Sequence, residues 1–191
     1  MKTDIKLSGV GGQGILSIAT VIGQAATTAG LHLKQAEVHG MSQRGGDVQS
    51  DLRLSTEDIH SDLIALGTAD LILSMEPMEA LRYLPYLGKE GVVVTSSKPF
   101  VNIPDYPDET SLLEELDALP RVARMDIEQV ARTLMAPRSA NMVLLGMAAR
   151  YIPILTPAHL REAIRTIFGS KGEKTVSDNL KAFDAGYEGI Q

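Results

Sequence analysis

A chain of 191 residues, 44% hydrophobic and 22% charged, has the composition of a globular protein with one large domain. Its formal net charge of −6 argues against a broad nucleic-acid-binding surface, which needs clustered lysine and arginine. The chain has no cysteine, which excludes disulfides, a cysteine nucleophile and cysteine-bound zinc or iron–sulfur clusters within it. It shows neither a membrane-length apolar run nor the apolar segment of a signal peptide, so we expect a cytoplasmic protein without nucleic-acid or membrane partners.

The first forty residues alternate between strand and helix patterns. Residues 5–10 form a short apolar run that ends at glycine, which is typical of a buried strand. Residues 15–29 are apolar or small on almost every face and predict a buried helix that Gly30 terminates. Residues 33–38 predict a second strand, and residues 39–46 are too polar and glycine-rich for regular structure.

Residues 47–54 alternate between two faces. Val48, Leu52 and Leu54 point one way, and the polar side chains of Asp47, Gln49, Asp51 and Arg53 point the other. A strand with one wet face is typical of an antiparallel or edge position. We therefore expect a mixed sheet.

Strands and helices continue to alternate and then give way to helices. The patterns predict strands at residues 71–75, 92–95 and 122–125, and helices at 78–84, 112–119, 127–136, 140–151, 157–168 and 176–187. This order predicts a three-layer α/β/α sandwich with a Rossmann-like mixed sheet and a helical C-terminal third, in a single domain over residues 1–191.

A glycine-rich loop joins the first strand to the first helix. Gly9, Gly11, Gly12 and Gly14, with Gln13 between the last two, fit the pattern G-x-G-x-x-G. Glycine allows a tight turn, and free N–H groups of the following helix attract anions. The pattern is equally compatible with a phosphate-type ligand and with a close-packed turn. Ile15 stands where a phosphate-binding P-loop would have lysine.

Glu37 leaves two alternative functions open. Dinucleotide-binding folds often place an acid near the end of the second strand, where it binds ribose hydroxyls. The chain could therefore be a stand-alone NAD(P)-dependent dehydrogenase, although no catalytic constellation is recognisable in it. It could also be a nucleotide- or coenzyme A-binding module without a redox partner.

Further polar residues follow predicted strands at the same edge of the sheet. His39, Gln43 and Arg44 offer donors to a phosphate, a carboxylate or a partner chain, and Gly45 lets the backbone approach the same ligand. Glu76 follows the strand at 71–75 and either orients His39 or Arg44 or stabilises the N-terminus of its own helix. Asn141 lies among apolar residues, so we expect it to tie its helix to a loop. The pair Lys171 and Lys174 is compatible with phosphate contact or with a solvated loop.

Two segments together suggest a family. GVGGQGI (residues 9–15) and EVHGMSQRGG (37–46) resemble the gamma-type subunit or domain of 2-oxoacid:ferredoxin oxidoreductases, most closely the beta-subunit type of the indolepyruvate branch. Residues 76–81 and 141–146 and the end pattern from Phe168-Gly169 fit the same family. Pyruvate and 2-oxoglutarate relatives tend to have a loop with Pro and Glu in place of residues 39–46, which favours the aryl-pyruvate branch.

The resemblance implies a division of labour. Enzymes of this family convert a 2-oxoacid and coenzyme A to an acyl-CoA and CO2 and pass the electrons to ferredoxin. Thiamine diphosphate and iron–sulfur clusters would lie in a larger, cysteine-rich partner subunit, and this chain would complete the site of that partner. The isolated chain would therefore be inactive. It would hold no cofactor, metal or catalytic residue. Coenzyme A would be the co-substrate. The expected contacts to it are Gly9, Gly11, Gly12, Gln13, Gly14, His39, Gln43, Arg44, Gly45 and Glu76, and Met41 would face the partner.

Overall fold

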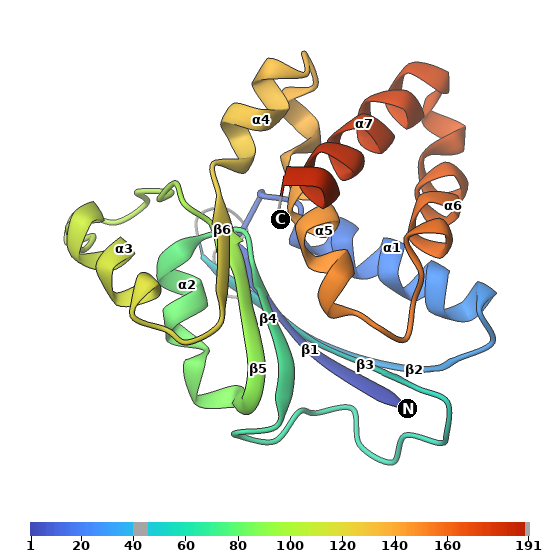
Figure 1. The fold of residues 1–191 in the computed structure, drawn as a ribbon, viewed down its shortest axis with the longest axis horizontal. Coiled ribbons are helices and arrows are strands. Elements are labelled where there is room, and N and C mark those ends of the chain that lie inside the picture. Colours follow the sequence, from blue (N-terminus) through green and yellow to red (C-terminus); the bar gives the residue numbers. More distant parts are fainter. Residues whose placement is uncertain (40–45, 190–191) are drawn as a thin grey trace.

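The computed structural model describes residues 1–39 and 46–189, and its centre is a six-stranded sheet in the order β2-β3-β1-β4-β5-β6 (Figure 1). Strands β1, β4, β5 and β6 run parallel, whereas β3 runs antiparallel to both of its neighbours, β1 and β2. The mixed sheet expected from the alternating pattern of residues 47–54 is confirmed. The strands are β1 (Lys2–Val10), β2 (His32–His39), β3 (Asp47–Ser55), β4 (Ala69–Ser74), β5 (Leu87–Ser96) and β6 (Val122–Met125).

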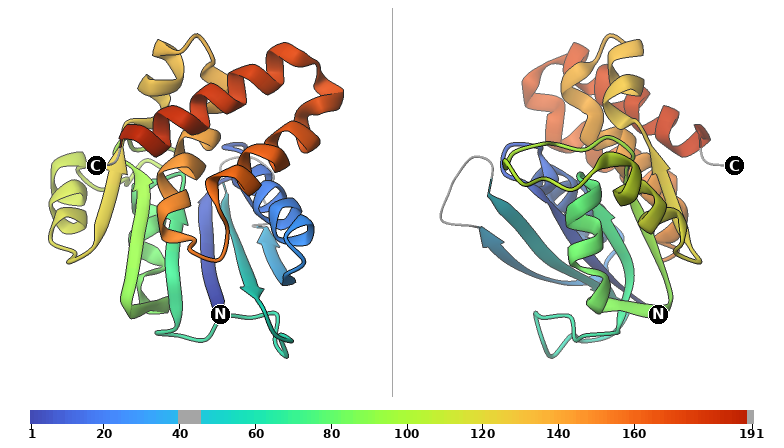
Figure 2. Two further views of the ribbon diagram at one scale, coloured as in Figure 1. Left: turned by 45° about the vertical axis from the view of Figure 1, so that its right-hand side comes forward. Right: turned by 90° about the vertical axis from the view of Figure 1, so that its left-hand side faces the viewer.

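Helices cover both faces of the sheet, as the three-layer prediction requires (Figures 1 and 2). One face carries α2 (Pro77–Arg82) and α3 (Glu109–Asp117). The other carries α1 (Ile15–Thr28) and α5 (Ala140–Ala148), with α6 (Pro157–Phe168) packed on α1 and α7 (Glu173–Gly189) packed on α5. Helix α4 (Ile127–Thr133) leads from β6 into α5. The α/β class and the helical C-terminal third are confirmed.

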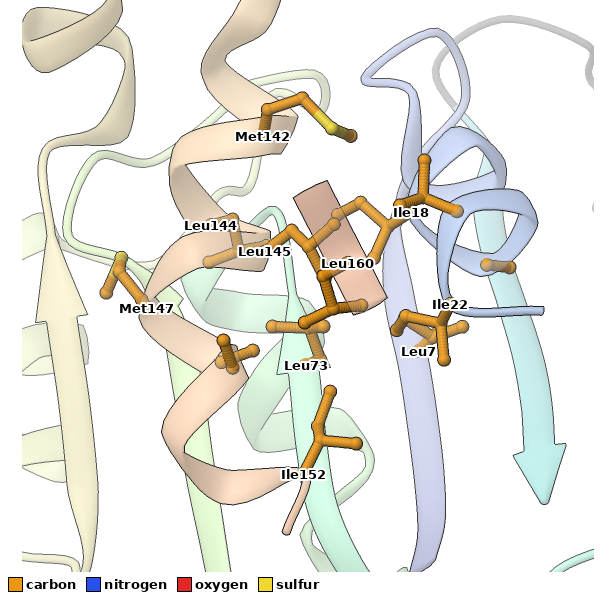
Figure 3. Packing of buried hydrophobic residues seen from close by; sticks show 14 of the residues in the cluster. Leu7, Ile18, Ile22, Leu73, Met142, Leu144, Leu145, Met147, Ile152 and Leu160 are labelled. Atoms are coloured by element: carbon orange, nitrogen blue, oxygen red, sulfur yellow. The ribbon is translucent and has the colours of Figure 1, made fainter. Parts of the chain in front are cut away.

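The larger hydrophobic core lies between the sheet and α1, α5 and α6. Leu7 and Leu73 of the sheet face Ile22 of α1, Leu145 of α5 and Leu160 of α6 (Figure 3). A smaller cluster under α2 and α3 contains Ile72, Val93 and Leu116. The apolar character of α1 on nearly all faces is therefore explained by its position between the sheet and α6.

Helices α5 and α7 approach each other so closely that two glycines are required. A Cβ atom on Gly146 would lie 2.0 Å from the carbonyl oxygen of Phe183, and one on Gly186 would lie 1.9 Å from that of Val143. Contacts at these distances are impossible without movement of the backbone. The C-terminal helices thus lock together through backbone-to-backbone contact.

The prediction that the polar side chains of β3 face water is wrong for Asp51. Asp51 is buried, with Oδ1 2.7 Å from Lys6 Nζ of β1, and its Oδ2 accepts a hydrogen bond from the amide of Ile64. The rings of Tyr83 and Tyr86 also lie against the Lys6 ammonium group. At Asp51, the polar face of β3 is therefore covered and its charge is paired with a lysine on the neighbouring strand.

The predicted end of the helix at residues 127–136 also differs from the structure. Helix α4 ends at Thr133, before the expected residue 136. Met135, two residues before Pro137, has a left-handed backbone (φ 56°). The helix cannot continue through this conformation. The turn that results leads into the start of α5.

Candidate functional site

The glycine loop between β1 and α1 depends on left-handed backbone conformations. Gly12 has φ 101° and Gly14 has φ 84°, values that favour glycine. A Cβ atom on Gly14 would also lie 2.9 Å from Nδ2 of Asn141. Helix α1 begins directly after Gly14, with no side-chain cap and no acidic residue in its first turn. Its first N–H groups are therefore directed away from the helix without an intrahelical acceptor.

Other residues of this loop hold the turn together. The amide of Val10 donates to Oε1 of Gln13 at 2.8 Å. A Cβ atom on Gly9 would meet the same oxygen at 3.1 Å and Cβ of Met75 at 3.2 Å. Gly9 thus fits the close-packed interpretation left open by the sequence, and Gln13 braces the loop with its side chain.

The two glycine-rich segments meet at the carboxyl end of the sheet. The amide of Gly11 donates a hydrogen bond to the carbonyl oxygen of Gly46 at 2.9 Å, so the second segment ends against the first. His39 closes β2 opposite Val48, but its side chain lies outside what the structure describes. Met41, Gln43, Arg44 and Gly45 also fall outside the described residues, and their predicted roles remain predictions.

A cleft of about 840 Å³ opens beside the glycine loop. The starts of three helices line it: Gly14 and Ser17 at α1, Ser139 and Asn141 at α5, and Lys174 and Thr175 at α7. Helix N-termini carry partial positive charge and unpaired N–H groups. Three such ends that converge on one cleft favour an anionic ligand.

The charged side chains of the cleft are mixed in sign, with cations in excess. Arg138, Lys171 and Lys174 line it together with the acids Glu128 and Asp178. Lys174 Nζ lies 2.6 Å from Asp178, and its side chain is largely exposed. Lys171 and Lys174 are exposed, as the solvated-loop alternative expects, and they line the same cleft as the glycine loop. The sequence could not bring them there, because more than 150 residues separate Lys171 from Gly14.

Asn141 ties α5 to the glycine loop, as its polar position in an apolar helix predicted. Its Nδ2 donates to the carbonyl oxygen of Gly14 at 3.1 Å, and the residue is almost fully buried. The bond connects two walls of the cleft and fixes the conformation of the loop between them.

Glu76 is not among the residues that line the cleft and is fully buried instead. Its fully buried carboxylate caps α2 by accepting from the amide of Glu79 at 2.9 Å. It also accepts from the amide of Phe100 at 3.3 Å and from the hydroxyl of Tyr106. Burial and the Glu76 carboxylate raise the pKa of Tyr106 above its usual range. Of the two roles open for Glu76, stabilising its own helix is the one that this geometry supports.

A pair of carboxyl groups lies next to Gly46, where the second glycine-rich segment ends. Burial raises the pKa of Glu79 to about 7; the ion pair with Arg82 opposes this shift, and the Asp47 carboxylate adds to it. Tyr83 donates its hydroxyl to Oδ2 of Asp47 at 2.6 Å, while Oδ1 of Asp47 is buried and has no donor among the described residues. A protonated Glu79 would supply that donor. No signal in the sequence indicated this pair.

The strand order weighs against a dinucleotide site that uses Glu37. In the nucleotide-binding fold, the second strand pairs directly with the first, so that its terminal acid approaches the glycine loop. Here β3 separates β2, which carries Glu37, from β1.

The described parts of the chain offer neither a metal site nor a membrane span. Within residues 1–39 and 46–189, no three His, Asp or Glu side chains cluster so that they could hold a metal ion. No helix in these ranges combines the length and hydrophobicity that crossing a bilayer requires.

These features define an α/β protein suited to an anionic ligand. It has a six-stranded mixed sheet, a glycine loop at the carboxyl edge of the sheet and an anion-favouring cleft beside that loop. The chain belongs to the pyruvate ferredoxin/flavodoxin oxidoreductase family, whose sequence profile matches residues 4–189. The family resemblance inferred from the two glycine-rich segments is confirmed.

Among curated proteins, the chain is similar to the indolepyruvate oxidoreductase subunit IorB of Thermococcus kodakarensis. The two are 38% identical over 192 aligned positions, which cover 96% of this chain and 93% of that subunit. The similarity therefore extends over nearly the whole of both proteins.

Solved structures share the fold at lower sequence identity. The gamma subunit of a keto/oxoacid ferredoxin oxidoreductase from Geobacter sulfurreducens superposes with a TM-score of 0.74 at 22% identity, covering 98% of this chain and 95% of that one. The 2-oxoglutarate:ferredoxin oxidoreductase of Magnetococcus marinus, solved with 2-oxoglutarate, coenzyme A and succinyl-CoA bound, gives a TM-score of 0.77 at 24% identity. It covers all of this chain, which spans only 32% of that longer chain.

Proposed function

We propose that this chain is the small subunit of a thiamine-diphosphate-dependent complex that oxidises a 2-oxoacid to an acyl-CoA and CO2 and reduces ferredoxin. The observation that carries the proposal is similarity over nearly the full length of both chains to a subunit named for indolepyruvate oxidation. We therefore assign an aryl pyruvate such as indolepyruvate as the substrate, and a cytoplasmic location. The chain acts as one domain over residues 1–191.

The redox chemistry belongs to a larger partner in this proposal. Decarboxylation of a 2-oxoacid needs an electron sink such as the thiazolium ring of thiamine diphosphate, and removal of the electrons needs a redox centre. A chain without cysteine cannot supply cysteine ligands to an iron–sulfur cluster. The isolated chain is therefore expected to be inactive towards every 2-oxoacid.

The cleft is the part of this subunit that we assign to coenzyme A. Its three helix N-termini and its cations, Arg138, Lys171 and Lys174, suit the phosphate groups of that co-substrate. Gly12 and Gly14 lie on its wall and let the ligand approach the backbone. We retain His39, Gln43, Arg44 and Gly45 as predicted contacts from the second glycine-rich segment.

The rival functions make different predictions for the isolated chain. A stand-alone dehydrogenase would bind NADH or NADPH tightly, whereas the intervening strand β3 makes us expect no saturable binding. A coenzyme A-binding module without a redox partner would bind its ligand but would copurify with no thiamine-binding subunit.

The deciding experiment is purification of the native complex followed by an activity assay. The chain should copurify with a larger subunit that contains thiamine diphosphate and iron–sulfur clusters, and the complex should form acyl-CoA from indolepyruvate while ferredoxin is reduced. Pyruvate and 2-oxoglutarate serve as competing substrates. A native chain that purifies alone, or a single chain that forms acyl-CoA, would overturn the proposal.

A further inference from the structure

Residues 97–108, which join β5 to α3 and which we call the apolar loop, expose several large apolar side chains within four positions. Phe100 and Ile103 are each 43% exposed, and Val101 is 71% exposed. In Figure 1 the loop leaves the carboxyl end of β5 and runs past α2 to α3. Apolar side chains that are exposed together, rather than singly, mark a surface that another molecule covers.

The apolar loop is held in place by buried polar groups. The carboxylate of Glu76 accepts from the amide of Phe100, the first residue of the exposed segment, and from the hydroxyl of Tyr106, which follows that segment. Ser96 Oγ accepts from the amide of Lys98 at 3.0 Å, and Lys98 Nζ lies 3.0 Å from Glu109. Prolines at 99, 104 and 107 further limit the backbone. A loop ordered in this way loses little conformational entropy when it binds.

The apolar loop begins at a contact with the segment that leads into α4. The amide of Ser97 donates to the carbonyl oxygen of Met125 at 2.9 Å, and the next residue, Asp126, caps α4. Helix α4 carries Glu128, which lines the cleft. Met75, at the end of the neighbouring strand β4, lines it as well. The start of the apolar loop is therefore linked to two elements that line the cleft.

We propose that residues 100–103 are a docking site for the larger subunit of the complex and that Glu76 is the positioning residue that holds this site in its binding conformation. The proposal rests on the proposed function, which supplies the partner. The same fold makes up about a third of a longer chain in the Magnetococcus protein, so in that protein it is joined to further polypeptide. In the proposed complex, the separate larger subunit takes the place of that further polypeptide.

The charges around the apolar loop favour that partner over a second copy of this chain. Asp105 and Asp108 follow the exposed segment, and Lys98 and Glu109 flank it as an ion pair. Two copies that met at this loop would bring acidic rims together, which opposes association. A partner that presents an apolar pocket with a basic rim fits the same surface.

The test measures binding of the chain to its thiamine-containing larger subunit, which is isolated from the native complex. The double variant Val101→Ser/Ile103→Ser should raise the dissociation constant at least tenfold, because it removes exposed apolar groups without disturbing the fold. The matched control, Leu63→Ser/Leu66→Ser, changes side chains that are 64% and 67% exposed in the connection between β3 and β4. It should bind within twofold of wild type, and circular dichroism of all three proteins should agree.

The role of Glu76 is tested by amide hydrogen exchange together with affinity. Tyr106→Phe removes one of the bonds to Glu76, and Glu76→Ala removes them all, so exchange in residues 98–104 should rise in that order along with the dissociation constant. Glu76→Gln keeps an acceptor oxygen and should restore both. The Val101→Ser/Ile103→Ser variant should lose affinity without faster exchange at the loop.

The other outcomes of these binding experiments distinguish failure of the docking site from failure of the proposed function. Equal binding by the loop variant and the wild type, or an equal loss in the control, overturns the docking site and leaves the proposed function intact. A wild-type chain that binds no thiamine-containing subunit overturns both. Gel filtration of the isolated chain completes the set: a dimer that the loop variant dissociates, with unchanged binding to the larger subunit, assigns the surface to self-association and overturns the inference.

Discussion

The side chain of Asn141, at the start of α5, donates a hydrogen bond to the carbonyl oxygen of Gly14, 127 positions earlier in the chain. The bond joins the C-terminal helices to the glycine loop at the point where both line the cleft. Because Gly14 has a left-handed backbone, the conformation of the loop and the position of α5 are set together.

Replacement of Asn141 should therefore destabilise the protein. Asn141→Ala leaves the Gly14 carbonyl without its partner, at a cost of about 1–3 kcal/mol in the free energy of unfolding. Asn141→Asp should be worse, because a carboxylate placed against a carbonyl oxygen is repelled. Urea denaturation gives both values. Stability of Asn141→Asp equal to that of wild type would contradict the structural role of the bond.

The contact between α5 and α7 gives a prediction with a matched control. Gly146→Ala should lower the free energy of unfolding by about 1–3 kcal/mol or more, since its Cβ atom would lie 2.0 Å from the Phe183 carbonyl oxygen and the helices must separate. Gly169→Ala, at a position with φ −54° and no neighbouring atom within 4 Å, should instead stabilise by about 0.4–1 kcal/mol. Thermal unfolding of the two variants compares them directly. Equal effects would exclude the close helix contact.

The raised pKa of Glu79 predicts how the free energy of unfolding changes with pH. Its pKa is raised from 4.5 to about 7 in the folded protein. Between these values the folded state holds a proton that the unfolded state has released, so the free energy of unfolding should increase as the pH falls from about 8 to about 5. The effect has this sign because a raised carboxyl pKa means that the charged form is disfavoured by folding.

Two substitutions isolate the contribution of Glu79. Glu79→Gln removes the titrating group and should flatten the pH dependence in this window. Glu115→Gln, on the exposed surface of α3, should leave it unchanged. Chemical denaturation at several pH values provides the measurement. The assignment fails if the slope persists in Glu79→Gln.

The assignment of coenzyme A to the cleft is tested by charge removal. Lys171→Ala/Lys174→Ala should raise the coenzyme A concentration for half-maximal activity of the complex by roughly tenfold, equivalent to about 1.4 kcal/mol. Assembly should be unaffected, because both lysines are exposed and lie outside residues 100–103, the proposed docking site. Lys89→Ala removes an exposed charge at the opposite edge of the sheet and serves as the control. An unchanged coenzyme A response in the double variant would remove these lysines from the site.

Local patterns in the sequence predicted most of the fold. Helix α6 was predicted with its observed bounds, because Thr156 caps it, Pro157 suits its first turn and Gly169 follows its end. The antiparallel strand β3 followed from its alternating pattern. Such signals lie within a few residues of the element that they specify.

Contacts between distant residues could not be predicted in the same way. Asp51 forms a buried ion pair with Lys6 on the neighbouring strand. The sequence does not reveal this partner, so Asp51 was predicted to face solvent. The lysines at 171 and 174 reach the cleft only because α7 packs on α5. Asn141 was an exception, since a polar residue inside an apolar helix must find a partner even when the partner is unknown.

The most direct test of the account compares the isolated chain with the reconstituted complex. Acyl-CoA formation from indolepyruvate is measured with ferredoxin as acceptor for the small chain alone, the thiamine-containing larger subunit alone, and the two combined. The account predicts no turnover by the small chain, and full activity only when both subunits are present. Turnover by the small chain alone, or full activity of the larger subunit without it, would contradict the central claim that this chain completes the site of its partner.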